Sequence, residues 1–162
     1  MDDSMVVREA GPLDAQAIFK LSNHPSIRKA SFNHSPINWK EHLRWFKRVR
    51  GDPRCGFYVL EIGGALAGQI RFSLEGARAT VSISVDPRYR GRGVGTCLYR
   101  QGLAAFEVRY RVKEIVAKIK KLNMESFAFF KGLGFAFDSE ECINGQEAVV
   151  MVSKLASPEV AS

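Results

Sequence analysis

Apolar and polar residues recur along the chain with two different periods, and each change of period marks a new element. After a short apolar strand at 5–9, apolar residues recur every three or four positions at 13–21 and at 39–46, which predicts two helices. Asn38 is a plausible N-cap for the second of them. The residues between them, 22–37, contain Asn, His, Ser and two prolines, and predict irregular structure.

In the middle of the chain the period becomes two, which is typical of strands. Runs at 57–62, 65–74 and 80–85 are separated by glycine turns, so they predict an antiparallel meander. The later pattern predicts a helix at 95–109, a strand at 114–119, a helix at 123–131 and closing strands at 135–138 and 147–152. A strand–helix–strand unit after a meander implies a mixed sheet covered by helices, and the fold class is α/β (α+β).

Composition narrows the class of protein. The chain has 162 residues, 46% hydrophobic and 25% charged, which suits one globular domain and excludes wholesale disorder. We expect a single domain at 1–155 and a flexible tail at 156–162. The formal charge of +7 favours anionic partners: nucleic acid, acidic lipid or phosphorylated small molecules.

Several features argue against a membrane, a secretory route and a metal. No apolar run approaches the roughly 18 residues of a membrane span, and the acidic start lacks the apolar region of a signal peptide. Cys55, Cys97 and Cys142 are odd in number and far apart, so they cannot form a fully paired disulfide set and show no zinc-ligand spacing. We expect a cytoplasmic protein without a metal.

A loop rich in glycine and arginine joins the third meander strand to the next helix. It runs Val85-Asp-Pro-Arg-Tyr-Arg-Gly-Arg-Gly-Val-Gly-Thr96. Glycine lets the backbone turn tightly and approach a ligand, and the free N–H groups of a helix N-terminus attract anions. No Lys-Ser/Thr pair follows the last glycine, which excludes a Walker loop, and Thr96 replaces the third glycine of a dinucleotide fingerprint. The loop predicts a site for a pyrophosphate.

Two segments resemble motifs of the GCN5-related N-acetyltransferase (GNAT) family. Arg90-Gly-Arg-Gly-Val-Gly95, which follows Val85-x-Pro87, resembles the acetyl-CoA motif Q/R-x-x-G-x-G/A. Asn123, Ser126 and Phe130-Lys-Gly-Leu-Gly-Phe135 resemble the closing N-x-x-(A/S)-…-(Y/F)-x-K-x-G-F segment. The element order is similar over about 5–153. The resemblance implies a mixed, mostly antiparallel sheet of about seven strands flanked by four helices, with a splayed parallel strand pair at the cofactor site.

The resemblance also implies acetyl-CoA as co-substrate and an amine as acceptor. In the family, loop amides bind the CoA pyrophosphate and the splayed strand pairs with the pantetheine. The implied cofactor-binding residues are Ser84, Val85, Arg90, Gly91, Arg92, Gly93, Val94, Gly95, Thr96, Asn123, Phe130 and Lys131. Asn123 also fits a plain helix N-cap, and Lys131 also fits an exposed charge at a helix end.

The catalytic residues stay unassigned. Many family members carry a tyrosine as general acid at the position of Phe130, and a phenyl ring has no proton to give. Some members keep a glutamate on the strand before the loop, whereas strand 80–85 has no carboxylate. Glu61, Glu75 and Lys118 are near in strand order, and a water chain along the serines of strand 80–85 is a credible substitute for a base.

In the family, the first two helices and their connection build the acceptor site. Here that segment is similar, in Ile27-Arg28, Asn33, Ile37, His42 and Trp45-Phe46, to members that acetylate nucleotide-linked amino sugars. The implied acceptor contacts are Arg28, Asn33, His34 and Trp39. Arg28 could pair with a diphosphate, and it could equally be a solvated loop charge.

The leading hypothesis is an N-acetyltransferase in which an amine attacks the thioester directly. A protein N-terminus or an amino acid is the alternative acceptor, and a non-catalytic acyl-CoA sensor is the alternative class. The basic runs at 109–113 and 118–121 suggest a third hypothesis, a nucleic-acid-binding domain, but no helix-turn-helix or RNP pattern accompanies them. We therefore expect a small-molecule amine acceptor, no nucleic-acid or membrane partner, and a monomer or homodimer.

Overall fold

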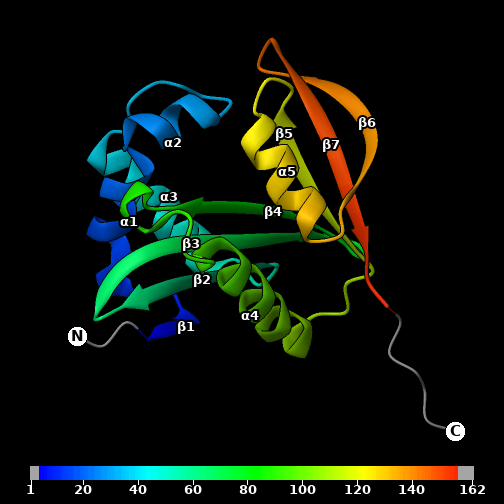
Figure 1. Ribbon diagram of the computed structural model, residues 1–162. Coiled ribbons are helices and arrows are strands. Elements are labelled where there is room, and N and C mark those ends of the chain that lie inside the picture. The colour runs from blue at the N-terminus through cyan, green and yellow to red at the C-terminus, as the bar shows by residue number, and fades with distance from the viewer. Residues whose placement is uncertain (1–3, 157–162) are drawn as a thin grey trace, which may run out of the picture.

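The computed structural model describes residues 4–156, which share one seven-stranded sheet of order β1-β2-β3-β4-β5-β7-β6 (Figure 1). The strands are β1 (Met5–Glu9), β2 (Cys55–Ile62), β3 (Ala65–Glu75), β4 (Arg78–Val85), β5 (Glu114–Lys120), β6 (Ala136–Ile143) and β7 (Gln146–Lys154). The helices are α1 (Ala15–Ser22), α2 (Pro25–Ala30), α3 (Trp39–Gly51), α4 (Val94–Arg109) and α5 (Met124–Gly132). The expected tail at 156–162 lies, apart from Ala156, outside the described residues.

The sheet opens between β4 and β5. All other neighbouring strands are antiparallel, and these two are parallel. Their pairing runs only from Arg78 opposite Glu114 to Val81 opposite Ala117, and β4 then continues to Val85 without β5 beside it. Figure 1 shows β5, β6 and β7 turned away from β2, β3 and β4. The mixed sheet of seven strands and its splayed parallel pair are therefore confirmed.

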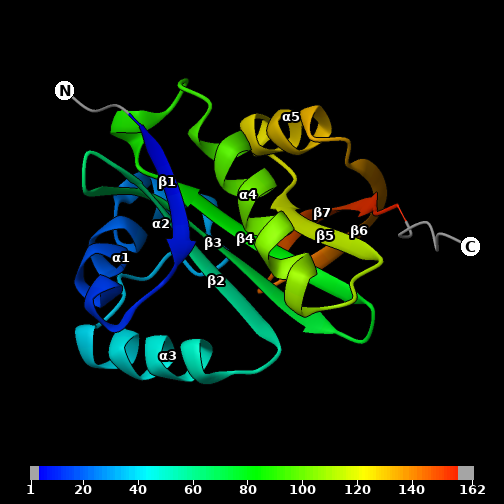
Figure 2. The same ribbon diagram turned by 90° about the horizontal axis from the view of Figure 1, so that it is seen from below.

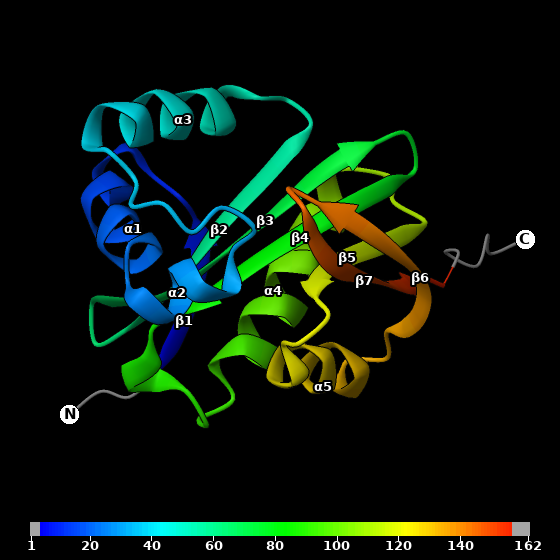
Figure 3. The same ribbon diagram turned by 90° about the horizontal axis from the view of Figure 1, so that it is seen from above.

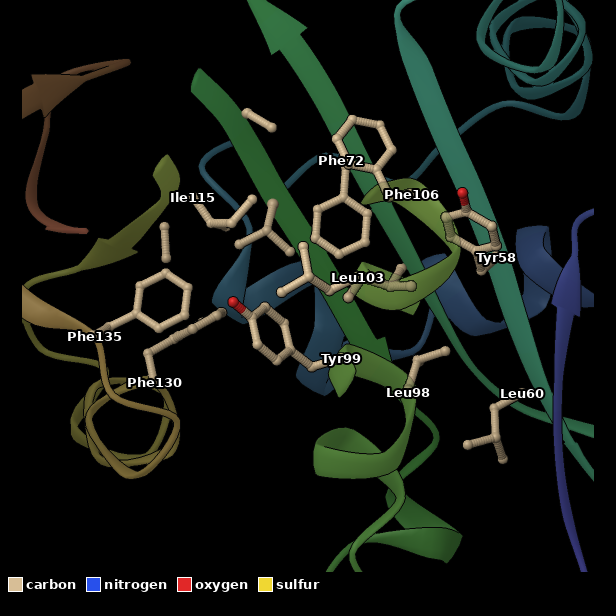
Figure 4. Close-up of a cluster of buried hydrophobic side chains, with 14 of the residues drawn as sticks. Tyr58, Leu60, Phe72, Leu98, Tyr99, Leu103, Phe106, Ile115, Phe130 and Phe135 are labelled. Atoms are coloured by element: carbon tan, nitrogen blue, oxygen red, sulfur yellow. The ribbon is translucent and has the colours of Figure 1, made fainter. Parts of the chain in front are cut away.

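Helices α4 and α5 cover one face of the sheet and enclose the main core (Figure 2). Strand residues at alternate positions point into it, as the period of two predicts. Phe72 of β3 and Phe106 of α4 are both fully buried, and their rings stack with centroids 5.0 Å apart. Figure 4 shows these two rings among Tyr58, Leu98, Tyr99, Leu103 and Ile115, so α4 is fixed against the centre of the sheet.

Helices α1, α2 and α3 lie on the other side of the sheet (Figure 3). A smaller core joins α1 and α3 to β2, with Ile18, Phe46, Phe57 and Val59 at its centre. The same face of β3 and β4 carries polar side chains, because Gln69 lies opposite Ser84 and Arg71 lies opposite Ser82. A polar strip therefore runs along the sheet beside the point where β4 and β5 separate.

The segment at 22–37 is less irregular than the sequence predicts. Pro25 to Ala30 form α2, a helix that brings the described α-helices to five instead of the expected four. Pro25 occupies the first helical position, where its missing N–H is not needed, and Nδ1 of His24 accepts a hydrogen bond from the backbone N–H of Ser26. These local contacts start a short helix that has too few residues to show an apolar period.

His42 of α3 makes the stability of this face sensitive to pH. The side chain is 2% exposed, its Nε2 lies 2.8 Å from the carbonyl oxygen of Ala15, and its ring stacks on those of Trp39 and Phe46. Burial lowers the pKa of His42 below its ordinary value of 6.5, because it disfavours the charged imidazolium. The native state therefore holds fewer protons than the unfolded chain as the pH falls through 6.5.

We expect the free energy of unfolding to fall by up to about 1.4 kcal/mol per pH unit below pH 6.5, until the folded-state pKa is reached. His42→Gln should remove that slope, since an amide can donate to Ala15 and does not titrate. Urea denaturation between pH 5 and 7.5 measures it, with exposed His24→Gln as the control that keeps the slope. An equal slope in the wild type and His42→Gln would contradict the assignment.

Candidate active site

The N-terminus of α4 is built from backbone alone. Gly93 is its N-cap in the left-handed conformation with φ 77°, and no side chain caps the helix. The N–H of Cys97 makes the first helical hydrogen bond, 3.0 Å to the carbonyl oxygen of Gly93, so the N–H groups of Val94, Gly95 and Thr96 have no partner within the helix. These donors and the positive end of the helix dipole suit an anion.

The loop before α4 leaves open space around this helix end. Gly91 also has φ 77°, and a Cβ built on Gly91 or Gly93 would meet no heavy atom within 4 Å. Glycine at both positions lets the chain turn in a conformation that L side chains rarely adopt. The result is an exposed stretch of backbone that a pyrophosphate could approach.

Positive charge surrounds the loop. Arg88 is ion-paired with Asp86 at 2.8 Å, and this guanidinium holds the pKa of Asp86 below its usual value. Arg90 donates a hydrogen bond to Oγ of Ser26 in α2, 3.1 Å away, and Arg92 lies over the ring of Tyr89. Within residues 4–156 neither Arg90 nor Arg92 is ion-paired, so both charges remain available to an anionic ligand.

The loop, the free end of β4 and α5 meet at Gly95. A Cβ at Gly95 would lie 2.9 Å from Cε2 of Phe129 and 3.7 Å from Cγ2 of Val85, so only glycine permits this approach. Ser84 and Val85 belong to the part of β4 that has left β5, and both are half-buried. Their position fits a strand whose free edge pairs with an extended ligand.

The second motif shapes α5. Oδ1 of Asn123 accepts the backbone N–H of Ser126 at 3.1 Å, and its Nδ2 donates to the hydroxyl of Ser126 at 3.0 Å, so Asn123 is the helix N-cap. Phe130 is 5% exposed, and its ring lies 5.0 Å from that of Phe135 (Figure 4). Lys131 is exposed in the last turn of the helix.

The groups weighed as proton acceptors are mostly engaged elsewhere. Glu61 forms an ion pair with Arg8 at 2.6 Å, and Lys118 forms one with Glu141 at 3.2 Å. Glu75 lines a cavity of about 230 Å³ at the far ends of β2, β3 and β4. Ser82 and Ser84 remain the polar side chains on the open part of β4, and the structure assigns no catalytic base.

Arg28, Asn33 and His34 shape the connection between α2 and α3. Arg28 donates from Nε to the carbonyl oxygen of Ser22 at 2.8 Å and from Nη1 to those of Asn33 and Ser35 at 2.8 and 3.1 Å. Most of its donors are therefore used to hold the loop. Asn33 accepts the N–H of Ser35 through its own side chain, and His34 is exposed.

The same loop is tied to the far half of the sheet. Nζ of Lys120 at the end of β5 donates to the carbonyl oxygen of Lys29 at 2.6 Å and also contacts Nε2 of His34. Nε2 of Gln146 at the start of β7 donates to the carbonyl oxygen of Phe32 at 2.7 Å. Trp39 lies apart from these contacts, with its ring packed edge-on against Phe19 of α1.

The sequence analysis missed two residues of the polar strip. Gln69 donates weakly to Oγ of Ser84 at 3.4 Å, and Nη2 of Arg71 donates to Oγ of Ser82 at 3.2 Å. A signal for them exists in the sequence. If the turn at Gly76 sets the hairpin register, the polar residues of the two flanking strands fall opposite one another.

The described residues contain no group of three or more His, Cys, Asp and Glu that could hold a metal ion. None of the helices in residues 4–156 combines the length and the apolar character needed to span a bilayer.

A family comparison agrees with this geometry. The sequence model of the "Acetyltransferase (GNAT) family" matches residues 17–135, which include the α4 loop and α5. The chain belongs to the GNAT family. It is therefore an acyltransferase of the N-acetyltransferase type, and the resemblance of the two motifs to the GNAT family is confirmed.

Three curated relatives of this GNAT protein are named as acetyltransferases. The "N-alpha-acetyltransferase" of Sulfurisphaera tokodaii is 26% identical over 142 residues, which are 80% of this chain and 78% of that protein. Two other curated relatives, 26% and 28% identical, are matched over 38% and 50% of their own lengths.

Solved structures share the fold. The ribosomal-protein-alanine N-acetyltransferase of Brucella melitensis has a TM-score of 0.80 at 20% identity, over 93% of this chain and 99% of that one. The spermidine N-acetyltransferase of Vibrio cholerae, solved with CoA and spermine, has a TM-score of 0.80 at 19% identity, over 93% and 95% of the two chains.

The two interpretations of Asn123 can be separated in this GNAT domain. Asn123→Ala should lower the free energy of unfolding by about 1 kcal/mol, because the N–H of Ser126 loses its partner. Asn123→Asp should restore the cap and hence the stability. If Asn123 also contacts the cofactor, Asn123→Asp should still bind CoA more weakly, since a carboxylate repels its phosphates. Urea denaturation and calorimetric titration with CoA measure the two effects, and full stability in Asn123→Ala would contradict the capping role.

Proposed function

We propose that this chain is an acetyl-CoA-dependent N-acetyltransferase that moves an acetyl group to a primary amine by direct attack on the thioester. The observation that carries the proposal is the uncapped, glycine-lined N-terminus of α4 beside the open end of β4. The helix end offers backbone donors for a pyrophosphate. The adjoining free edge of β4 offers hydrogen-bonding groups for the amides of the pantetheine arm. The Vibrio cholerae relative, solved in complex with CoA and spermine, supports the same use of the fold.

Each part of the site has a separate task in this proposal. The N–H groups from Gly91 to Thr96 bind the pyrophosphate, since the N–H of Arg90 already donates to the carbonyl oxygen of Pro87, and the guanidinium groups of Arg90 and Arg92 add charge. Ser84 and Val85 hold the pantetheine arm through the edge of β4 that faces away from β3. This arrangement fixes the thioester near the point where β4 and β5 separate, which is also where the polar strip lies.

The chemistry needs a neutral amine. Its nitrogen attacks the acetyl carbonyl carbon, the C–S bond breaks, the thiolate leaves, and the nitrogen gives up a proton. A lysine-like amine is mostly protonated at pH 7, so a proton must be removed before attack. The hydroxyls of Ser82 and Ser84 can carry it to water, and Phe130 has no hydroxyl to protonate the thiolate. Thiolates leave readily, so solvent can supply that proton afterwards.

For the acceptor, we propose a small-molecule amine, with a nucleotide-linked amino sugar as the first candidate. This candidate rests on the similarity of residues 27–46 to the corresponding segment of enzymes that acetylate such sugars, and hydrogen bonds hold the loop from Arg28 to Ile37 between α1 and β5–β7. An amino acid or a protein N-terminus is the alternative within the same chemistry. The buried, hydroxyl-free Phe130 favours one other function, an acyl-CoA sensor that binds without turnover.

Two measurements test the proposal. Calorimetric titration should show acetyl-CoA binding, and a thiol reagent should report CoA release when nucleotide amino sugars, free amino sugars, amino acids, peptides and polyamines are added in turn. Transfer to at least one amine is expected. Tight binding with no transfer to any amine would establish the sensor instead, and absence of binding would refute both.

A further inference from the structure

The polar strip contains buried side-chain atoms that lack a hydrogen-bond partner. Within residues 4–156, two buried side-chain nitrogen or oxygen atoms have no hydrogen-bond partner: Oε1 of Gln69 and Nε of Arg71. The two residues alternate along β3 and so point to the same face of the sheet. Buried polar atoms are almost always paired in native proteins, so two orphans side by side indicate a place where a ligand supplies the partners.

Arg71 is a cation without an anion. Its guanidinium carbon lies 4.7 Å from the centre of the Trp45 ring and 6.0 Å from that of Phe57, and no ion pair joins it to a carboxylate in the described chain. Burial lowers the pKa of Arg71, and a guanidinium nevertheless remains charged in proteins. A buried charge without a counter-ion lowers the stability of the folded state, and a negatively charged ligand group would offset that loss.

The same guanidinium is held at the place where acetyl transfer is proposed. Its Nη2 donates to Oγ of Ser82, the first residue of β4 beyond the last pairing with β5. Nε2 of Gln69 donates to Oγ of Ser84, which lies two residues beyond Ser82 on the part of β4 that is not paired with β5. The orphaned atoms therefore border the reaction centre on the α1–α3 side of the sheet.

We propose that the acceptor amine carries an oxyanion, a carboxylate or a phosphate, and that Arg71 binds it while Gln69 contacts the same molecule. This inference rests on the proposed acetyl transfer and names the class of its acceptor. The planar donors of a guanidinium match a carboxylate or phosphate, and stacking on Trp45 fixes their direction.

Matched pairs of acceptors test the inference. We would compare alanine with alaninamide, and glucosamine 1-phosphate with glucosamine, using the wild type, Arg71→Gln and Arg71→Lys. The wild type should prefer the anionic member of at least one pair by about 10- to 100-fold in kcat/KM, the usual effect of a charge-assisted hydrogen-bond pair. Arg71→Gln should lose that preference, mainly through a higher KM for the anionic member. Arg71→Lys should recover part of the preference, because it restores the charge.

Arg44→Gln, an exposed substitution on α3, is the control and should keep the preference of the wild type. Equal rates for both members of each pair in the wild type would overturn the inference alone. A loss of kcat in Arg71→Gln that is equal for charged and neutral acceptors would also overturn it, since it would place Arg71 in the chemistry or the scaffold. Failure of the wild type to acetylate any amine would overturn the proposed function together with it. If Arg71→Gln does not fold, the wild-type pairs and Arg71→Lys still decide.

Discussion

Replacing Gly93 with valine is expected to weaken CoA binding by about 100-fold, an effect composed of backbone strain and lost amide donors. Gly93 has φ 77°, a conformation that a β-branched residue cannot adopt without strain. The backbone would relax toward negative φ and turn the N–H groups of Val94 and Gly95 away from the proposed pyrophosphate site. The valine side chain would also fill the open space in front of the helix end.

Calorimetric titration with CoA measures this loss, and urea denaturation measures the stability of the same variant. Gly51→Ala is the matched control, because Gly51 ends α3 with ordinary φ and open space around its Cβ position. It should leave CoA binding unchanged. Unaltered CoA affinity in Gly93→Val would show that the pyrophosphate does not bind at the N-terminus of α4.

A second large effect concerns stability. Phe72→Ala should lower the free energy of unfolding by about 3–5 kcal/mol, since it removes a fully buried ring and leaves a cavity. The ring stacks on Phe106 and lies 6.3 Å from that of Tyr99, so its loss uncouples α4 from the sheet (Figure 4). Single domains are stable by only about 5–15 kcal/mol, and such a loss is a large part of that total.

The midpoint of guanidinium unfolding, compared with that of the wild type, measures the change. Leu13→Ala is the control, because Leu13 is 97% exposed and its truncation should shift the midpoint little. A loss below about 1 kcal/mol in Phe72→Ala would mean that the neighbouring rings collapse into the space, in contrast to typical core sites.

Local chemistry explains why much of the site could be predicted from sequence. The glycines at 91 and 93 require positive φ, and Asn38 and Asn123 cap their helices with their own side chains, as expected. The turns at Gly63, Gly64 and Gly76 also adopt positive φ and set the meander. Each of these features depends on residues within a few positions of one another, so the sequence carries them directly.

Other features depend on residues far apart in the chain. Arg28 was considered for a diphosphate, and its donors are instead used by carbonyl groups that only the folded loop brings to it. Arg71 lies between Trp45 of α3 and Ser82 of β4, and its lack of an acidic partner becomes visible only when all neighbours are known. Periodicity assigns such a residue to a face of the sheet and cannot report its partners.

The hydrogen bonds that tie the α2–α3 loop to the far half of the sheet have a consequence for the order of folding. Lys29 and Lys120 are 91 residues apart in the chain, and Phe32 and Gln146 are 114 apart. Contacts of such long range close large loops of chain, and loop-closure entropy delays them until the intervening segments have collapsed. The α2–α3 loop should therefore acquire its native form after α4. During refolding, protection of the Phe32 region from hydrogen exchange should lag behind that of α4.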